Sequence, residues 1–159
     1  GLTSANAAVF DISATTSGAS IVSLAGSSTA NNGVVLGSNT LTLSNASGNY
    51  SGVIGGTGGL TLTAGTETLS GVNTYTGSTT LNGGTLALSG SGSISTSSGV
   101  SSANAAVFDI SATTSGASIA TRSAPTTASP GWSDAVRLQG TAFRCCSTKR
   151  PSAPTSSAA

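Results

Sequence analysis

Few side chains in this sequence could do chemistry. Its 159 residues contain no histidine, four acidic residues and two cysteines. Without histidine, the chain cannot build a Ser-His-Asp or Cys-His arrangement, and a zinc site would have to use Cys145, Cys146 and carboxylates alone. No Gly-x-Ser-x-Gly elbow and no phosphate-binding Walker loop occurs. These absences argue against nucleophilic and nucleotide-dependent enzymes.

Glycoside hydrolysis remains open, because in its usual form it needs two carboxyl groups about 5 to 10 Å apart. The acidic residues before position 122 are Asp11, Glu67 and Asp109, and they are scattered along the chain. We expect each to be a solvated side chain at a strand edge. Asp11 and Asp109 occupy equivalent positions in two identical segments, which predicts a structural placement such as a corner hydrogen bond.

Calcium binding is not expected. Gly55-Gly56-Thr57-Gly58 begins like the Gly-Gly-x-Gly-x-Asp repeat of calcium-binding β-rolls, but it lacks the aspartate that would supply ligands. The sequence therefore predicts no catalytic, cofactor-binding or metal-binding residue, and no cofactor.

Polar and aromatic residues at corners and on strands have structural interpretations. Asparagines could cap turns or stack into ladders, and capping is the default. We expect Tyr50 and Tyr75 to cover a core near corners rather than to bind sugar. Outward threonine pairs could bind ice if they formed one column over many coils, but the pairs at Thr61 and Thr66 lie too near in sequence to share it. The asparagines are Asn39, Asn45, Asn73 and Asn82, and the pairs are Thr40/Thr42, Thr61/Thr63 and Thr66/Thr68.

Short strands must position these residues. In the repeat core, residues 52–88, brief alternations of apolar and polar residues are separated by glycine and asparagine, which supply tight corners. Leu41-x-Leu43, Leu60-x-Leu62 and Leu86-x-Leu88 recur about one coil apart. An antiparallel meander and a solenoid both fit this pattern. We favour the solenoid, because stacking at that period gives one continuous apolar core.

The composition is unusual for a compact domain. Charged residues make up 6% of the chain, against about a quarter in globular proteins. Disorder is disfavoured because 36% is hydrophobic and the mean hydropathy is +0.21. No apolar run approaches the roughly 18 residues of a membrane helix, and the N-terminus lacks a signal-peptide layout. We expect an internal piece of a longer protein.

The repeat core resembles the passenger-associated transport repeat of bacterial autotransporters, which are type V secreted proteins. The resemblance lies in 51–54, 56–60, 69–77 and 79–86, and it extends loosely from Ala7 to Ile119. It implies an all-β fold, a right-handed parallel β-helix. It also implies a non-catalytic segment, a surface-displayed or secreted stalk that supports export and adhesion. The absence of cysteine before residue 122 suits a passenger that crosses the outer membrane as an extended chain.

The same resemblance implies a location at the bacterial cell surface or outside the cell. The expected partners are the outer-membrane β-barrel translocator of the parent protein, which we expect outside these 159 residues, and host or cell-surface ligands. Nucleic acid binding and membrane insertion are not expected. The alternatives are a fragment of a carbohydrate-active β-helix enzyme and a Thr-rich adhesin or ice-binding surface.

One segment of identical sequence occurs twice, at 4–21 and at 102–119. Soon after the second copy the composition changes, because all five basic residues, all four prolines and both cysteines fall in residues 122–159. We therefore expect a β-helix passenger segment over 1–121 and a poorly ordered, basic, Pro/Ser/Ala-rich tail over 122–159. The tail is either a native disordered linker or the product of a frameshift. A docking arm is disfavoured because its charges are scattered.

Overall fold

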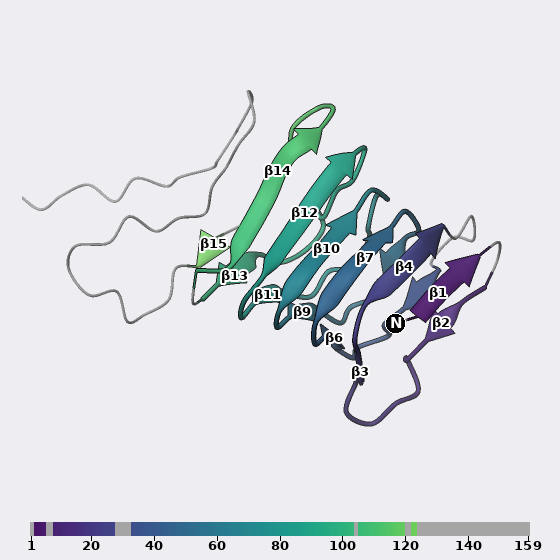
Figure 1. The fold of residues 1–159 in the computed structure, drawn as a ribbon. Coiled ribbons are helices and arrows are strands. Elements are labelled where there is room, and N and C mark those ends of the chain that lie inside the picture. Colours follow the sequence, from purple (N-terminus) through teal and green to yellow (C-terminus); the bar gives the residue numbers. More distant parts are fainter. Residues whose placement is uncertain (1, 6–7, 28–32, 104, 120–121, 124–159) are drawn as a thin grey trace, which may run out of the picture.

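The computed structural model describes residues 2–5, 8–27, 33–103, 105–119 and 122–123. Within these residues every paired strand is parallel to its neighbours and there is no helix. The strands stack as successive coils, which makes the chain an all-β solenoid of about five turns (Figure 1). The predicted solenoid is confirmed, and the antiparallel meander is excluded.

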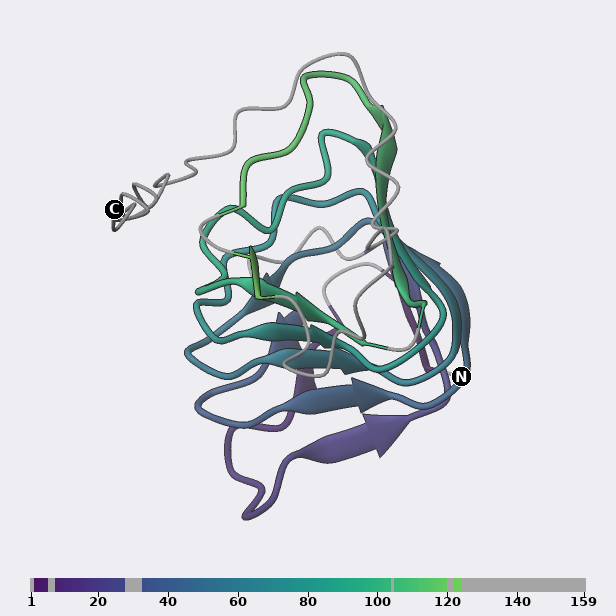
Figure 2. The ribbon, with the colours of Figure 1, turned by 90° about the vertical axis from the view of Figure 1, so that its left-hand side faces the viewer.

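Three sheets form the walls of the solenoid (Figure 2). In spatial order, the first sheet contains β1 (Leu2–Ala5), β4 (Leu24–Ser27), β7 (Ala46–Tyr50), β10 (Gly65–Leu69), β12 (Thr85–Gly90) and β14 (Val107–Thr113). The second sheet contains β3 (Ala19–Ile21), β6 (Leu41–Leu43), β9 (Leu60–Leu62), β11 (Thr79–Leu81), β13 (Val100–Ser102) and β15 (Arg122–Ser123). The third sheet contains β2 (Phe10–Asp11), β5 (Val34–Val35) and β8 (Ile54–Gly55).

Each complete turn passes through the first sheet, then the third, then the second. Beyond β8 the described residues form no further strand in the third wall, and an isolated parallel bridge pairs Val72 with Ser93 there. Alternation within each strand sends apolar residues inward, as in β6 and β9, where two buried leucines flank a partly exposed threonine. The inward residues of all the coils form one continuous core cluster that extends from Ile12 to Ile110.

The coils in the middle of the chain have equal lengths. Leu41 pairs with Leu60 and Leu60 with Thr79, so β6, β9 and β11 stack in register at a constant sequence step. The prediction that Leu86-x-Leu88 continues the column of Leu41 and Leu60 is wrong. Leu86 and Leu88 lie in β12 of the first sheet, where they pair with Glu67 and Leu69. The sequence spacing alone could not distinguish one wall of the coil from the next.

The two identical segments occupy different walls of the solenoid. Phe10 pairs with Val34 in the third sheet, whereas Phe108 pairs with Leu86 in the first sheet. Coil lengths differ, because the step from Ala19 to its partner Leu41 is longer than the step from Leu41 to Leu60. The duplication therefore does not span a whole number of turns. Asp11 and Asp109 are equivalent in sequence but not in the fold.

The solenoid pairing continues slightly beyond the predicted boundary at residue 121. β15 pairs with β13, with Val100 opposite Arg122. The rest of the predicted tail, including Cys145 and Cys146, lies outside the described residues. Its poor order stays a prediction.

Candidate functional site

Asp11 and Asp109 both make the local hydrogen bond that the sequence predicts. Oδ1 of Asp11 accepts the backbone N–H of Ser13 at 2.8 Å, and Oδ1 of Asp109 accepts that of Ser111 at 2.8 Å. The side chain and the backbone of Ser13 hold the pKa of exposed Asp11 below its usual value. In both segments the bond ties the carboxylate to the local backbone.

This identical motif produces two different backbone features. After β2 it forms a turn, whereas in β14 it lies at a β-bulge, since Asp109 pairs with Ala87 and Ala112 pairs with Ser89. One additional residue is thereby accommodated on β14. A short Asp-x-Ser bond can serve either geometry because it involves only residues two positions apart.

The expectation that Glu67 is a solvated side chain at a strand edge is wrong. Glu67 is the middle residue of β10, and its side chain points into the solenoid with 0% of its surface exposed. Its Oε2 lies 3.4 Å from the backbone nitrogen of Leu24, and its Oε1 has no hydrogen-bond partner. Burial raises the pKa of this carboxyl to about 7, against the smaller lowering effects of Leu24 and Ser23.

The three carboxyl groups do not share one face. Asp11 is exposed on the third sheet, Glu67 is enclosed behind the first sheet, and Asp109 is on β14 at the far end of the stack. Among the described residues, no group of three or more histidine, cysteine, aspartate or glutamate side chains could hold a metal ion. The arrangement therefore offers no pair of carboxylates facing a common substrate.

No protein-family profile, curated protein or solved structure matches this chain. Its chemistry must therefore be judged from its own geometry. No helix long and apolar enough to cross a membrane occurs in the part of the chain that the structure describes.

The predicted burial of both tyrosines is confirmed. Tyr50 and Tyr75 are fully buried in the core. The Tyr75 hydroxyl lies 2.6 Å from Thr79 Oγ1, which in turn lies 3.1 Å from Ser97 Oγ. Ser97 Oγ donates to the Gly77 carbonyl at 2.9 Å, so a chain of hydroxyls crosses the interior between two coils. Burial raises the pKa of both tyrosines, so both hydroxyls keep their protons. The Tyr75 hydroxyl pairs with Thr79, whereas the Tyr50 hydroxyl has no hydrogen-bond partner.

The corner asparagines do more than cap their own turns. Nδ2 of Asn39 donates to the carbonyls of Ile12 and Thr15, at 2.9 and 2.8 Å, in the preceding coil. Asn73 is buried and contacts both the preceding and the following coil. Asn45 and Asn82 are exposed. Asn39 and Asn73 thus join coils individually, and the described asparagines do not stack on one another as a ladder.

Hydroxyl side chains form one outward column on the second sheet. In-register pairing aligns Ser20, Thr42, Thr61, Thr80 and Ser101. Ser101 Oγ lies 3.5 Å from Thr80 Oγ1. Only three consecutive members are threonines, which is shorter than the column over many coils that an ice-binding array requires. The prediction that Thr61 and Thr66 do not share a column is confirmed, because β9 and β10 belong to different sheets.

Proposed function

We propose that this chain is a non-catalytic structural segment of a bacterial autotransporter passenger. In this role it is a stalk that is exported through the outer-membrane barrel of its parent protein and stands on the cell surface or is released. The observation that carries the proposal is the stack of parallel coils around one continuous apolar core. The pattern of residues 51–86, which resembles the passenger-associated transport repeat, supports the choice of this secretion system.

The outer surface supports a spacer role. Over the described part of 8–119, Asp11 and Asp109 are the only charged side chains outside the core. The outward positions of the second sheet carry small uncharged residues such as Thr42 and Thr61. Parallel strands stack about 4.8 Å apart, so five turns hold their two ends about 24 Å apart. A stack of this kind gives length and stiffness.

The coil architecture also suits export. Each coil contacts mainly its neighbours, so coils can form one after another as a chain emerges through a pore. Adhesion through the exposed hydroxyl surface is a second role that the same stalk could serve for host or cell-surface ligands.

Surface display tests the proposal. The chain is placed between an N-terminal epitope tag and an autotransporter barrel in a Gram-negative host. We expect the tag to be stained by antibody on intact cells and removed by external protease. The control replaces the chain with a Gly/Ser linker of equal length, which cannot stack into coils as it emerges and should therefore bring less tag to the cell surface. Retention of the tag in the periplasm only with the solenoid present would contradict the proposal.

Enzyme assays test the main alternative. The purified chain is incubated with pectin-like and mucin-like glycans, and new reducing ends are measured. No release above that of a heat-unfolded sample is expected. Release that is lost in the Asp11→Asn or Asp109→Asn variant would instead identify a carbohydrate-active enzyme.

A further inference from the structure

The Glu67 side chain points into the solenoid interior, where its neighbour on β7 is a glycine and leaves space for it. It pairs with Gly48 of β7 on one side and with Leu86 of β12 on the other. Gly48 has no side chain, and a Cβ there would overlap the Leu24 carbonyl. The Glu67 side chain therefore passes over Gly48 and reaches the backbone of Leu24 in β4, two strands away.

The backbone around Leu24 is the irregular part of the first sheet. Only one residue pair, Gly26 with Tyr50, is in ladder register between β4 and β7. Five pairs join β7 to β10, by contrast. The step along the chain from Gly26 to its partner Tyr50 is also longer than the step from Tyr50 to its partner Leu69. Glu67 Oε2 contacts the Leu24 N–H where this ladder is incomplete.

Among the residues whose side chains the structure describes, no positive charge compensates the Glu67 carboxyl. Residues 1–121 contain no lysine, arginine or histidine. Of the elements packed against it, β4 and β12 carry no titratable side chain, and β7 carries only Tyr50, whose buried hydroxyl has no hydrogen-bond partner. Asp109 on β14 lies beyond β12 and pairs with Ala87, outside the inward column. To offset its desolvation, the ionised carboxylate therefore has only the backbone N–H of Leu24, at 3.4 Å, and the side chain of Ser23.

We propose that Glu67 is a proton-dependent latch that closes the first sheet between β4 and β7, while the ladders β5–β8 and β6–β9 hold the same two coils together in the other walls. With its proton, the carboxyl stays in the apolar interior and completes the joint between β4 and β7. Without its proton, the carboxylate draws water inward and the joint opens, which frees β4 from β7 while the stack from β7 to β14 stays paired. The latch is a property of this chain that holds whether or not the chain is an autotransporter stalk.

The direction of the pH effect follows from which form the fold prefers. Burial raises the pKa of Glu67 to about 7 in the closed joint, from its ordinary value of 4.5 in an exposed chain. Below pH 4.5 both states are protonated, so the joint carries no ionisation penalty. As the pH rises from 4.5 to 7, the open state ionises and the closed state does not, so closure is progressively lost. The penalty is full above pH 7.

Hydrogen–deuterium exchange of the full chain tests the latch. Exchange is measured at pH 5 and pH 8 and corrected for intrinsic rates, for peptides covering 22–27 and 46–50 and for a reference peptide covering 79–90. We expect the protection of the first two to fall at least about tenfold at pH 8, and the reference to change far less. Glu67→Gln, which cannot ionise, should remove this difference. Asp109→Asn in the same sheet should retain it.

Two results would overturn the latch. One is an equal pH effect on all three peptides, and the other is an unchanged pH effect in Glu67→Gln. If that variant fails to fold, the wild-type chain still decides the question through carbon-13 NMR titration of the Glu67 carboxyl. A midpoint near 7 is expected, and a midpoint near 4.5 would show that the carboxyl is not enclosed by the joint.

Discussion

The side chain of Asn73 accepts the backbone hydrogen bond of Ile54 that a next strand of the third sheet would otherwise accept. Its Oδ1 accepts the backbone N–H of Ile54 at 3.0 Å, at the point where the third sheet ends. Its Nδ2 donates to the carbonyls of Gly71 and Ser93, both at 3.1 Å. One amide therefore satisfies backbone groups of three successive coils, with 1% of its surface exposed. At this point of the third wall, side-chain hydrogen bonds of Asn73 replace the backbone ladder between neighbouring coils.

Asn73→Ala should destabilise the solenoid by about 2–3 kcal/mol, since the substitution leaves the buried N–H of Ile54 without its acceptor. An unpaired buried group alone costs about 1–3 kcal/mol. Urea unfolding followed by circular dichroism measures the loss. Asn82→Ala is the matched control, because Asn82 is exposed, and its effect should stay within about 0.5 kcal/mol. Equal effects of the two variants would show that the Asn73 amide does not support the wall.

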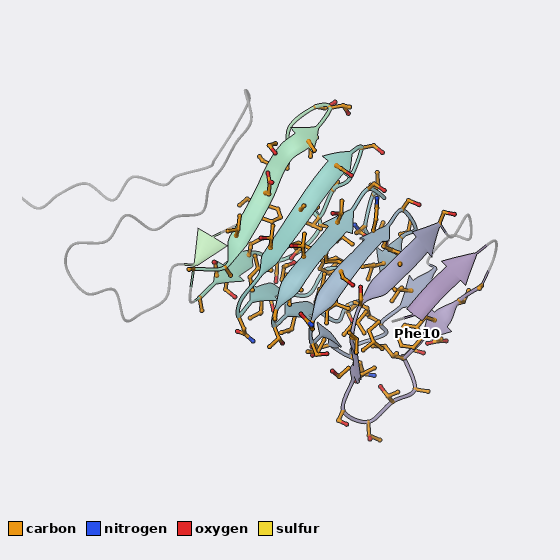
Figure 3. All side chains as sticks on the ribbon, viewed as in Figure 1. Phe10 is labelled. Carbon is orange, nitrogen blue, oxygen red and sulfur yellow. The ribbon has the colours of Figure 1, made fainter. Side chains whose placement is uncertain are left out.

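The duplicated segment supplies a second matched pair. Phe108 is a residue of β14 whose side chain is buried, with 2% of its surface exposed. Phe10 in β2 is only partly buried and packs against the core from the N-terminal coil (Figure 3). Phe108→Ala should cost about 3–5 kcal/mol through cavity formation. Phe10→Ala should cost about 1–2 kcal/mol, because less apolar area is returned to water.

Both phenylalanine variants are measured by urea unfolding of the full chain. The flanking residues are the same in the two copies, so any difference reports the wall in which each copy lies. Equal losses would contradict the different placements of β2 and β14.

The fold could be predicted because its signals are local. Strict alternation around Leu60 and Leu62 fixes which residues face inward, and glycine at corners fixes where the chain bends. The assignment of strands to walls could not be predicted in the same way. Coils differ in length and contain two or three strands each, so the spacing between leucine pairs does not identify a wall. The identical segments at Phe10 and Phe108 make this plain, since long-range pairing decides where each copy lies.

The burial of Glu67 had a sequence signal that charge obscured. The sequence predicts that Thr66 and Thr68 face outward, and alternation then places Glu67 inward with Leu69. An isolated carboxylate normally stays in water, so its charge predicts that Glu67 faces outward, whereas the alternation of the strand predicts that it faces inward. The period was correct because the strand is fixed by its neighbours on both sides. The contacts of Asn73 with adjacent coils could not be foreseen, since they depend on which residues stack above and below.

The hydroxyl chain of Tyr75, Thr79 and Ser97 has a direction that mutagenesis can reveal. Ser97 Oγ can give its single proton to the carbonyl of Gly77 at 2.9 Å or to that of Gly99 at 3.2 Å, and with either acceptor Thr79 donates to Ser97 and Tyr75 donates to Thr79. Tyr75→Phe removes only the terminal donor and should cost about 0.5–1.5 kcal/mol. Thr79→Val leaves the buried Tyr75 hydroxyl without an acceptor and should cost more, about 1–3 kcal/mol.

The double variant tests the coupling between these residues. In Tyr75→Phe/Thr79→Val the unpaired phenol is gone, so the total loss of unfolding free energy should be smaller than the sum of the two single losses. Simple addition of the two would contradict the hydrogen bond. A spectrophotometric titration gives an independent check, because burial raises the pKa of both tyrosines, so both should ionise at a higher pH in the folded chain than in the unfolded chain.

Removal of one whole coil should leave the solenoid folded. Residues 65–83 form one complete coil, because Gly65 pairs with Ala46 and Thr66 with Thr85. After their deletion, Thr85 can stack on Ser47 and Val100 on Leu60, with inward residues still facing inward. Neighbouring coils contribute stability in a nearly additive way, so we expect a sheet-type circular dichroism spectrum and cooperative unfolding at a lower urea midpoint.

Deletion of residues 65–74 is the control for the one-coil deletion, since it removes about half a turn and misplaces every later strand. This shorter deletion should abolish cooperative unfolding, although it leaves more of the chain intact. If the shorter deletion is tolerated as well as the longer one, the coil is not the unit that determines how this chain stacks.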